Sequence, residues 1–161
     1  MYDLNHILYT LISFLITAIL LILAKKFVKQ QKYKDLIVIL SAVVTVAIHY
    51  SGLFYDYFKN GSASVEDNLL LPVYPCNIAM WLLLATSLIR NKENKGYKFW
   101  AEFTFYLGVI GGTFGIILNA NYQSTPDLRN FHIFKGLLSH STMVFGCLYL
   151  LVGNYIKILF D

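Results

Sequence analysis

The chain alternates long apolar runs with short polar segments. Five of the runs reach about 18 residues or more, enough to cross the roughly 30 Å hydrocarbon core of a bilayer as a helix. Backbone N–H and C=O groups find no water there, so each run must be helical. The pattern predicts an all-α, polytopic transmembrane helix bundle of about five helices, with spans at residues 7–24, 36–53, 69–89, 99–118 and 131–156.

The composition fits a membrane protein better than a soluble domain. Of 161 residues, 57% are hydrophobic and only 14% are charged, whereas a soluble domain carries about a quarter charged residues. No internal repeat or low-complexity tract divides the chain, so we expect a single transmembrane domain over residues 1–161. The formal charge of +4 lies beside the apolar runs, which indicates orientation in a membrane and no nucleic-acid partner.

Lysine and arginine are distributed unevenly between the two sides that five alternating helices would have. Ten of the thirteen fall on one side, which the positive-inside rule identifies as cytoplasmic. We therefore expect a multi-pass protein of the cell (cytoplasmic) membrane, N-terminus out and C-terminus in. The ten are Lys25, Lys26, Lys29, Lys32, Lys34, Arg90, Lys92, Lys95, Lys98 and Lys157.

The fourth predicted span carries Gly108, Gly111, Gly112 and Gly115, with two pairs four residues apart. Small residues at this spacing let helix backbones approach closely in lipid. The glycines therefore predict a packing face within the bundle. The same spacing also allows a homo-oligomer through this helix.

Two prolines and a thiol mark the third predicted span. Pro72 and Pro75 favour a helix start or a break, and Cys76 follows directly. A thiol in the first turn of a helix meets free amide groups and the positive end of the helix dipole, which stabilise the reactive thiolate. The amide of Asn77 is a candidate extra donor to an oxyanion. The same cysteine also fits an inert buried thiol.

The length of this span places the thiol within the membrane. Residues 76–89 give only about 21 Å of helix, too short to cross the hydrocarbon. Residues 69–74 must then also lie in the membrane. We therefore expect a broken or kinked helix with Cys76 at the break, below the surface.

Two histidines are expected in the same outer half as Cys76. Counting from the outer ends of the spans gives depths of roughly 6 Å for His49, 10 Å for Cys76 and 13 Å for His140. His140 is then a candidate general base for the thiol. His49 and Asn119 are candidates for binding substrate or orienting the imidazole, and all three also fit ordinary buried polar residues. Cys147, deeper on the face of His140, is expected in the core without a disulfide.

Several motifs resemble one known family. Residues 71–76, LPVYPC, resemble the LPLHLC signature of the YwaF-like bacterial integral membrane proteins, whose animal relative is transmembrane protein 164. Residues 106–112 (YLGVIGG), 125–128 (TPDL) and 131–140 (FHIFKGLLSH) resemble the family's glycine-bearing helix, TPDL turn and HFRFxxFFxxH segment, in the same order. Tyr74 stands where the family has a histidine before the cysteine.

The resemblance implies a cysteine-dependent acyltransferase. Such an enzyme moves a fatty acyl chain between phospholipid and lysophospholipid through a thioester, with Cys76 in the nucleophile position and His140 in the histidine position. Membrane phospholipids and lysophospholipids would be the partners, and Tyr74 would help to bind or orient them. We expect no metal, because the cysteine and histidines lack a sequence-local pair at ligand spacing, and no other cofactor.

Two noncatalytic functions remain open at this point. One is a bundle that binds or transports a small solute through a polar outer vestibule formed by His49, Asn119 and His140. The other is an assembly or lipid-binding subunit. A thiolate nucleophile would not tolerate replacement of Cys76 by serine, whereas a vestibule would.

Overall fold

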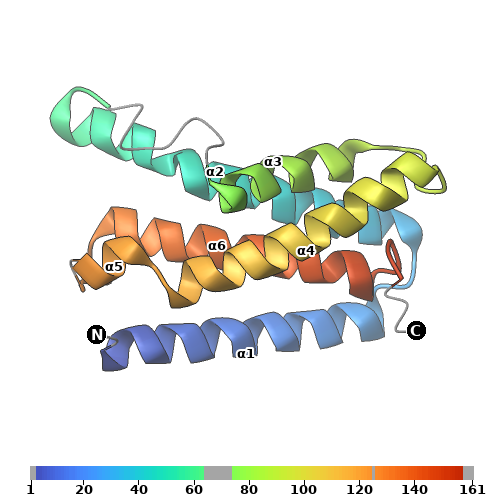
Figure 1. The fold of residues 1–161 in the computed structure, drawn as a ribbon, viewed down its shortest axis with the longest axis horizontal. Helices are drawn as coiled ribbons and strands as arrows, with labels where there is room; N and C mark the ends of the chain where they lie inside the picture. Colours follow the sequence, from blue (N-terminus) through green and yellow to red (C-terminus); the bar gives the residue numbers. More distant parts are fainter. Residues whose placement is uncertain (1–2, 64–73, 125, 158–161) are drawn as a thin grey trace.

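The computed structural model describes residues 3–63, 74–124 and 126–157. Every regular element in these ranges is a helix, and five long helices run up and down along the long axis of the molecule (Figure 1). The predicted all-α bundle is therefore confirmed. The helices are α1 (Leu4–Phe27), α2 (Gln31–Asn60), α3 (Pro75–Leu88), α4 (Lys95–Ile117), the short α5 (Ala120–Ser124) and α6 (Phe131–Val152).

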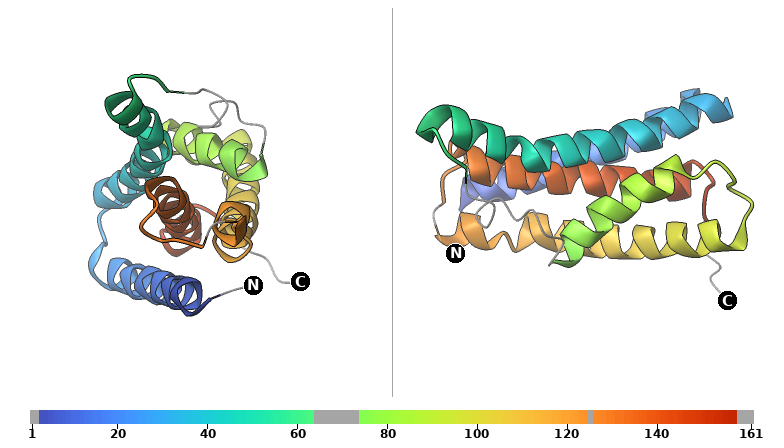
Figure 2. Two further views of the ribbon diagram at one scale, coloured as in Figure 1. Left: turned by 90° about the vertical axis from the view of Figure 1, so that its left-hand side faces the viewer. Right: turned by 90° about the horizontal axis from the view of Figure 1, so that it is seen from above.

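Helix α6 lies at the centre of the bundle. It packs extensively against α2 and α4, while α3 bridges these two helices and α1 packs almost only on α6. The end-on view in Figure 2 shows α6 enclosed by the other helices. The main core joins α2, α3, α4 and α6 and includes Ala42, Leu83, Ala101, Met143 and Leu150.

Four helical segments of the described ranges are long and apolar enough to cross a membrane: α1, α2, α4 together with α5, and α6. On α1 only His6 and Thr17 are buried, and a helix that is hydrophobic all round is typical of a membrane span. Helix α3 is apolar but has 14 residues, about 21 Å, and is too short to cross alone. The chain is thus a multi-pass membrane protein.

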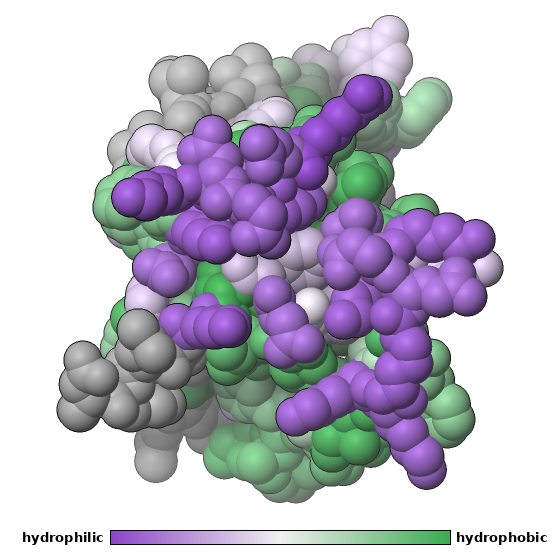
Figure 3. All heavy atoms as spheres, turned by 90° about the vertical axis from the view of Figure 1, so that its right-hand side faces the viewer, coloured by the Kyte–Doolittle hydropathy of each residue, from purple (hydrophilic) through white to green (hydrophobic). Residues whose placement is uncertain are grey.

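The ten lysine and arginine residues assigned above to one side gather at one end of the bundle. At this end α1 and α6 finish and α2 and α4 begin. Figure 3 looks onto it and shows hydrophilic side chains clustered over the helix ends. We name it the basic end. The alternation of five spans across a membrane and the orientation with the N-terminus out stay predictions.

Helix α2 runs past the predicted end of the second span at residue 53. The helix continues to Asn60 and ends at Gly61, whose φ of 73° suits glycine and whose N–H donates to the carbonyl of Tyr57. The helix includes Asp56, whose carboxylate pairs with His132 of α6. This partner satisfies the carboxylate within the bundle.

Two further boundaries differ from the prediction. Helix α6 ends at Val152, not at residue 156, because Gly153 caps it and donates to the carbonyl of Tyr149. The polar segment 119–130 contains the short helix α5, started by an Asn119 side chain that accepts from the N–H of Tyr122 at 2.9 Å. The expected start of the third span, at residues 69–73, lies outside the described residues.

Three glycines of α4 let α6 approach closely. A Cβ added to any of them would come within 3.0 Å of an α6 side chain, closer than real contacts allow. The predicted packing face is therefore confirmed within the chain itself, and a homo-oligomer through α4 stays a prediction. The partners run in antiparallel register: Gly108 faces Cys147, Gly112 faces Met143 and Gly115 faces His140.

Candidate functional site

Cys76 lies in the first turn of α3. Tyr74 is the N-cap, Pro75 is the first helical residue and Cys76 the second, as the missing N–H and fixed φ of proline favour. The Tyr74 carbonyl accepts from the N–H of Asn77 at 2.9 Å. Helix α3 begins partway along the bundle (Figure 2). The expected helix start at Cys76 is thus found, whereas the break or kink and the depth of Cys76 below the surface stay predictions, and Pro72 lies outside the described residues.

The amide of Asn77 lies beside the thiol. Asn77 is buried, and its Oδ1 accepts from the Cys76 Sγ at 3.6 Å. Its buried Nδ2 has no hydrogen-bond partner among the described residues. Leaving such a donor unpaired costs about 1–3 kcal/mol, so an unused donor lies next to the Cys76 thiol.

Cys76 and His140 pack against the same stripe of α4. The Cys76 backbone and Cβ lie 3.6–3.9 Å from the position of a Cβ on Gly111, and the His140 ring lies 2.7–2.8 Å from that of a Cβ on Gly115. Residues four apart on a helix have Cβ atoms about 6 Å from each other. The two positions on α4 that Cys76 and His140 contact therefore lie about one helical turn apart, with no hydrogen bond between these two described residues.

The order of depths differs from the prediction. Helix α4 runs away from the basic end, so Cys76, at the level of Gly111, lies about one turn nearer that end than His140. The predicted depths placed His140 deeper than Cys76. They differ because the predicted depths came from counting residues along each span, whereas the order in the structure follows from how α3 and α6 pack along α4.

His49 on α2 lies at a similar level to His140 on α6, since Thr45, one turn before His49, donates to Thr142, two residues after His140, at 3.0 Å. The His49 backbone carbonyl accepts from the Lys135 Nζ at 2.8 Å, and its ring meets the Tyr50 ring edge-on at 4.9 Å. The two histidines therefore lie at a similar level of the bundle, on neighbouring helices.

Asn119 and Tyr74 make no hydrogen bond to Cys76 or His140 among the described residues. The Asn119 Nδ2 donates to the Gly115 carbonyl at 3.4 Å, which makes Asn119 a cap for the end of α4, and the described structure has no hydrogen bond from it to His140. The Tyr74 side chain is exposed at the start of α3. In the described ranges, no three His, Cys, Asp or Glu side chains are grouped as a metal site would require.

Comparison with known families identifies the chain. The model of the TMEM164 family matches residues 1–161, the whole chain. The chain belongs to the TMEM164 family. This result confirms the resemblance to the relatives of transmembrane protein 164 that the motifs at residues 71–76 and 131–140 indicated. Searches of curated proteins and of solved structures gave no significant match.

Sequence reasoning missed a polar layer in this TMEM164-family bundle, between α2 and α6. The His132 Nε2 and the Asp56 Oδ1 are 2.7 Å apart, and Lys135 is buried where it reaches the carbonyl of His49. The spacing of these polar residues in the sequence could have indicated the layer. His132 and Lys135 are three residues apart and His49 and Asp56 seven apart, which are spacings for one face of a helix.

Proposed function

We propose that this TMEM164-family protein is a membrane-embedded acyltransferase that moves a fatty acyl chain from a phospholipid to a lysophospholipid through a thioester on Cys76. The observation that carries the proposal is the packing of Cys76, at the helical start of α3, and of the His140 ring one turn apart against one stripe of α4. A protein of the cell membrane meets both lipids in the bilayer.

The first half of the reaction forms the thioester. His140 takes the thiol proton as the two side chains rotate into hydrogen-bond distance, which catalytic pairs often reach only with substrate bound. The Cys76 Sγ attacks the ester carbonyl carbon, an S–C bond forms and the ester C–O bond breaks. The lysophospholipid leaves with the proton held by His140.

The second half regenerates the thiol. The hydroxyl of an acceptor lysophospholipid gives its proton to His140 and attacks the thioester carbon, and the Cys76 thiolate leaves. The proton then returns to the thiolate. No cofactor is consumed, and atoms balance over the cycle.

The oxyanion of each tetrahedral intermediate needs donors. The buried and unpaired Nδ2 of Asn77 lies beside the thiol, and the amides of the first turn of α3 point toward the same end of the helix. Loss of one oxyanion donor lowers the rate by about 10²–10³-fold. His49, at a similar level to His140 on a neighbouring helix, is proposed to orient the imidazole, and the exposed Tyr74 to contact the lipid.

The two cysteines offer a matched experiment. Purified protein in lipid nanodiscs receives a phospholipid with a labelled acyl chain and an unlabelled lysophospholipid, and transfer of the label is followed. Cys147 is fully buried on α6, where it packs against Gly108 of α4. We expect transfer by the wild type and by Cys147→Ala, and none by Cys76→Ala.

Two results would contradict this function. Equal transfer by Cys76→Ala and Cys147→Ala would remove Cys76 as the nucleophile. No transfer by any variant, together with solute binding that survives Cys76→Ser, would favour the noncatalytic vestibule.

A further inference from the structure

A groove lies beside α1, away from the cysteine site. Helix α1 packs almost only on α6, so a space remains between α1 and α2 with α6 as its floor. One cavity of about 240 Å³ lies between α1 and α6, and one of about 510 Å³ lies between α1, α2 and α6. They share Leu20, Thr142 and Phe145 as lining residues, and we name the two together the α1 groove.

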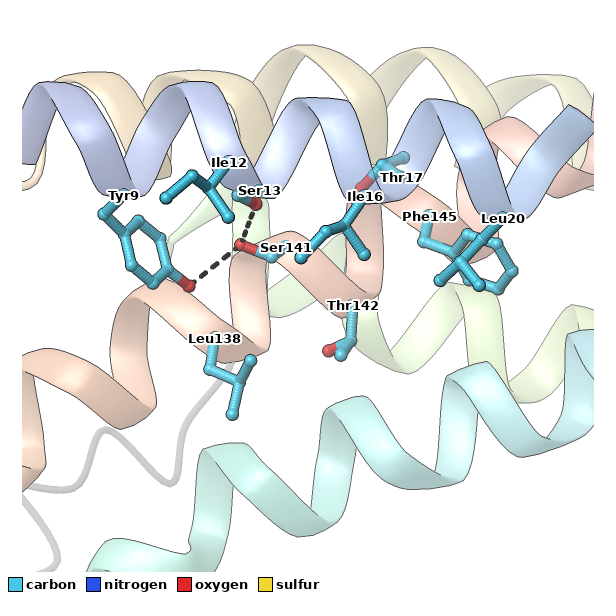
Figure 4. A pocket seen from close by; sticks show the side chains of 10 residues that line it. All are labelled: Tyr9, Ile12, Ser13, Ile16, Thr17, Leu20, Leu138, Ser141, Thr142 and Phe145. Carbon is cyan, nitrogen blue, oxygen red and sulfur yellow. Dashed lines mark hydrogen bonds between the residues drawn. The ribbon is translucent and has the colours of Figure 1, made fainter.

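The walls of the α1 groove are mainly hydrocarbon. Figure 4 shows the smaller cavity, where the hydroxyls of Tyr9 and Ser13 meet that of Ser141. The distances to the Ser141 Oγ are 3.1 Å from Tyr9 and 2.8 Å from Ser13. Because these hydroxyls pair with each other, the remaining surface suits an apolar occupant.

A third cavity, of about 230 Å³, adjoins the groove at the basic end. It shares Ala24 and Val28 with the larger cavity of the groove and is lined by Lys25, Lys29 and Lys34. We name it the basic pocket. No acidic side chain is among its described lining residues.

The lysines of the basic pocket have no acidic partner among the described residues. The Lys29 Nζ donates to the Lys25 carbonyl at 2.8 Å, and the Lys34 Nζ donates to the Gly153 carbonyl at 3.5 Å. An ammonium group has three donors, so each retains capacity for an anion. Three positive charges around one cavity thus lack a counter-charge from the described chain.

We propose that the basic pocket and the α1 groove bind one anionic phospholipid, with its phosphate in the pocket and an acyl chain in the groove. A cationic pocket continuous with an apolar groove matches the chemistry of an anionic amphiphile. Basic pockets between transmembrane helices bind such headgroups. The length of the larger cavity also fits, since Val28 to Leu20 covers about 12 Å of helix and a chain of one leaflet covers about 15 Å. The smaller cavity continues the groove from Leu20 to Tyr9.

The size of the groove favours a lipid chain over a protein helix. A membrane-spanning helix is about 10 Å wide and 30 Å long, roughly 2,000 Å³. The two cavities of the groove, about 240 and 510 Å³, together fall in the range of small-ligand sites, about 300–1,000 Å³.

The headgroup end of this site is remote from the proposed acyl transfer, whereas the far end of the groove reaches Ser141, beside His140. Along α6, His140 lies about 18 Å from Val152, which lines the basic pocket. Lipid binding there does not depend on the chemistry of Cys76, and the test below requires no catalysis.

The headgroup is tested with phosphatidylglycerol and phosphatidylcholine in nanodiscs, with retained lipid measured by native mass spectrometry. One variant carries Lys25→Gln, Lys29→Gln and Lys34→Gln. A matched control carries Lys26→Gln, Lys32→Gln and Lys95→Gln, which removes the same charge from the same end without touching the pocket lining.

The expected headgroup effect is large. Each lysine contributes about a fivefold preference for anionic lipid, on the order of 100-fold for three. The wild type and the control should keep this preference within about twofold of each other, and the pocket variant should lose it. A wild type without preference for phosphatidylglycerol, or equal losses in both triple variants, would overturn the proposal.

The acyl chain is tested with two neighbouring valines. Val43 and Val44 are similarly exposed, at 47% and 42%, but only Val44 lines the groove. Val44→Trp should lower the amount of retained phosphatidylglycerol at least tenfold, and Val43→Trp should leave it unchanged.

Two outcomes would assign the site to another ligand and overturn the proposal. Inorganic phosphate that displaces the lipid while Val44→Trp has no effect would indicate a soluble phosphate site. Loss of a dimer in Val44→Trp with unchanged lipid retention would indicate that a second copy fills the groove.

Discussion

Replacing Gly115 with alanine is predicted to displace the His140 imidazole. The added Cβ would lie 2.7–2.8 Å from three atoms of the ring, whereas nonbonded carbon atoms rest at about 3.5–4.0 Å. The ring must therefore move by about 1 Å. A displacement of about 1 Å lowers a catalytic rate by about 100-fold, and overpacking lowers the free energy of unfolding by about 1–3 kcal/mol.

Gly111 provides the control on the same helix. A Cβ there would lie 3.6–3.9 Å from Cys76, an ordinary contact, and alanine is favoured over glycine in a helix by about 1 kcal/mol. Acyl transfer and the midpoint of thermal unfolding are measured for both variants. We expect about a 100-fold slower rate in Gly115→Ala and a change of a few-fold at most in Gly111→Ala. Equal rates in the two variants would refute the reasoning.

Two further predictions concern stability. In Gly108→Ala the new Cβ would meet the Cys147 Sγ, which should destabilise the bundle by about 1–3 kcal/mol; adding Cys147→Ala should restore much of it in a double-mutant cycle, and additive losses would argue against the contact. The Tyr122 hydroxyl donates to Asp3 at 2.6 Å and, as the largest cause, lowers the pKa of Asp3. The ionised carboxyl therefore stabilises the fold above about pH 4, and the effect is lost as pH falls through the folded-state pKa; thermal unfolding between about pH 6 and pH 2 should depend less on pH in Tyr122→Phe, and identical pH profiles would contradict this.

Much of the fold could be predicted because the apolar runs and the lysine pattern report directly on the membrane. The glycines of α4 predicted close packing, which the contact of Gly112 with Val144 and Met143 shows. The helix ends were less predictable. The predicted second span ended at residue 53 and left out Asp56. Its α6 partner, His132, is 76 residues away in the sequence, so the chain order gives no sign of the pair.

The candidate site was predictable in its members and less so in its geometry. The prolines indicated a helix start at Cys76, and the depth count put His49 and His140 in one half of the bundle. The count could not show that α4 separates Cys76 and His140 by one turn, since this depends on tertiary register. Nor could it show that Asn119 caps α4, because an amide is equally suited to a cap and to a site.

The most direct test of the central claim is the mass of an acyl-enzyme. Protein mixed with a phospholipid and no acceptor is quenched in acid, digested and analysed by mass spectrometry. The account predicts one acyl group on the peptide that contains Cys76, released by hydroxylamine, present in Cys147→Ala and absent in Cys76→Ala. An acyl group on Cys147 instead, or no acyl-enzyme in a preparation that still transfers acyl chains, would contradict it.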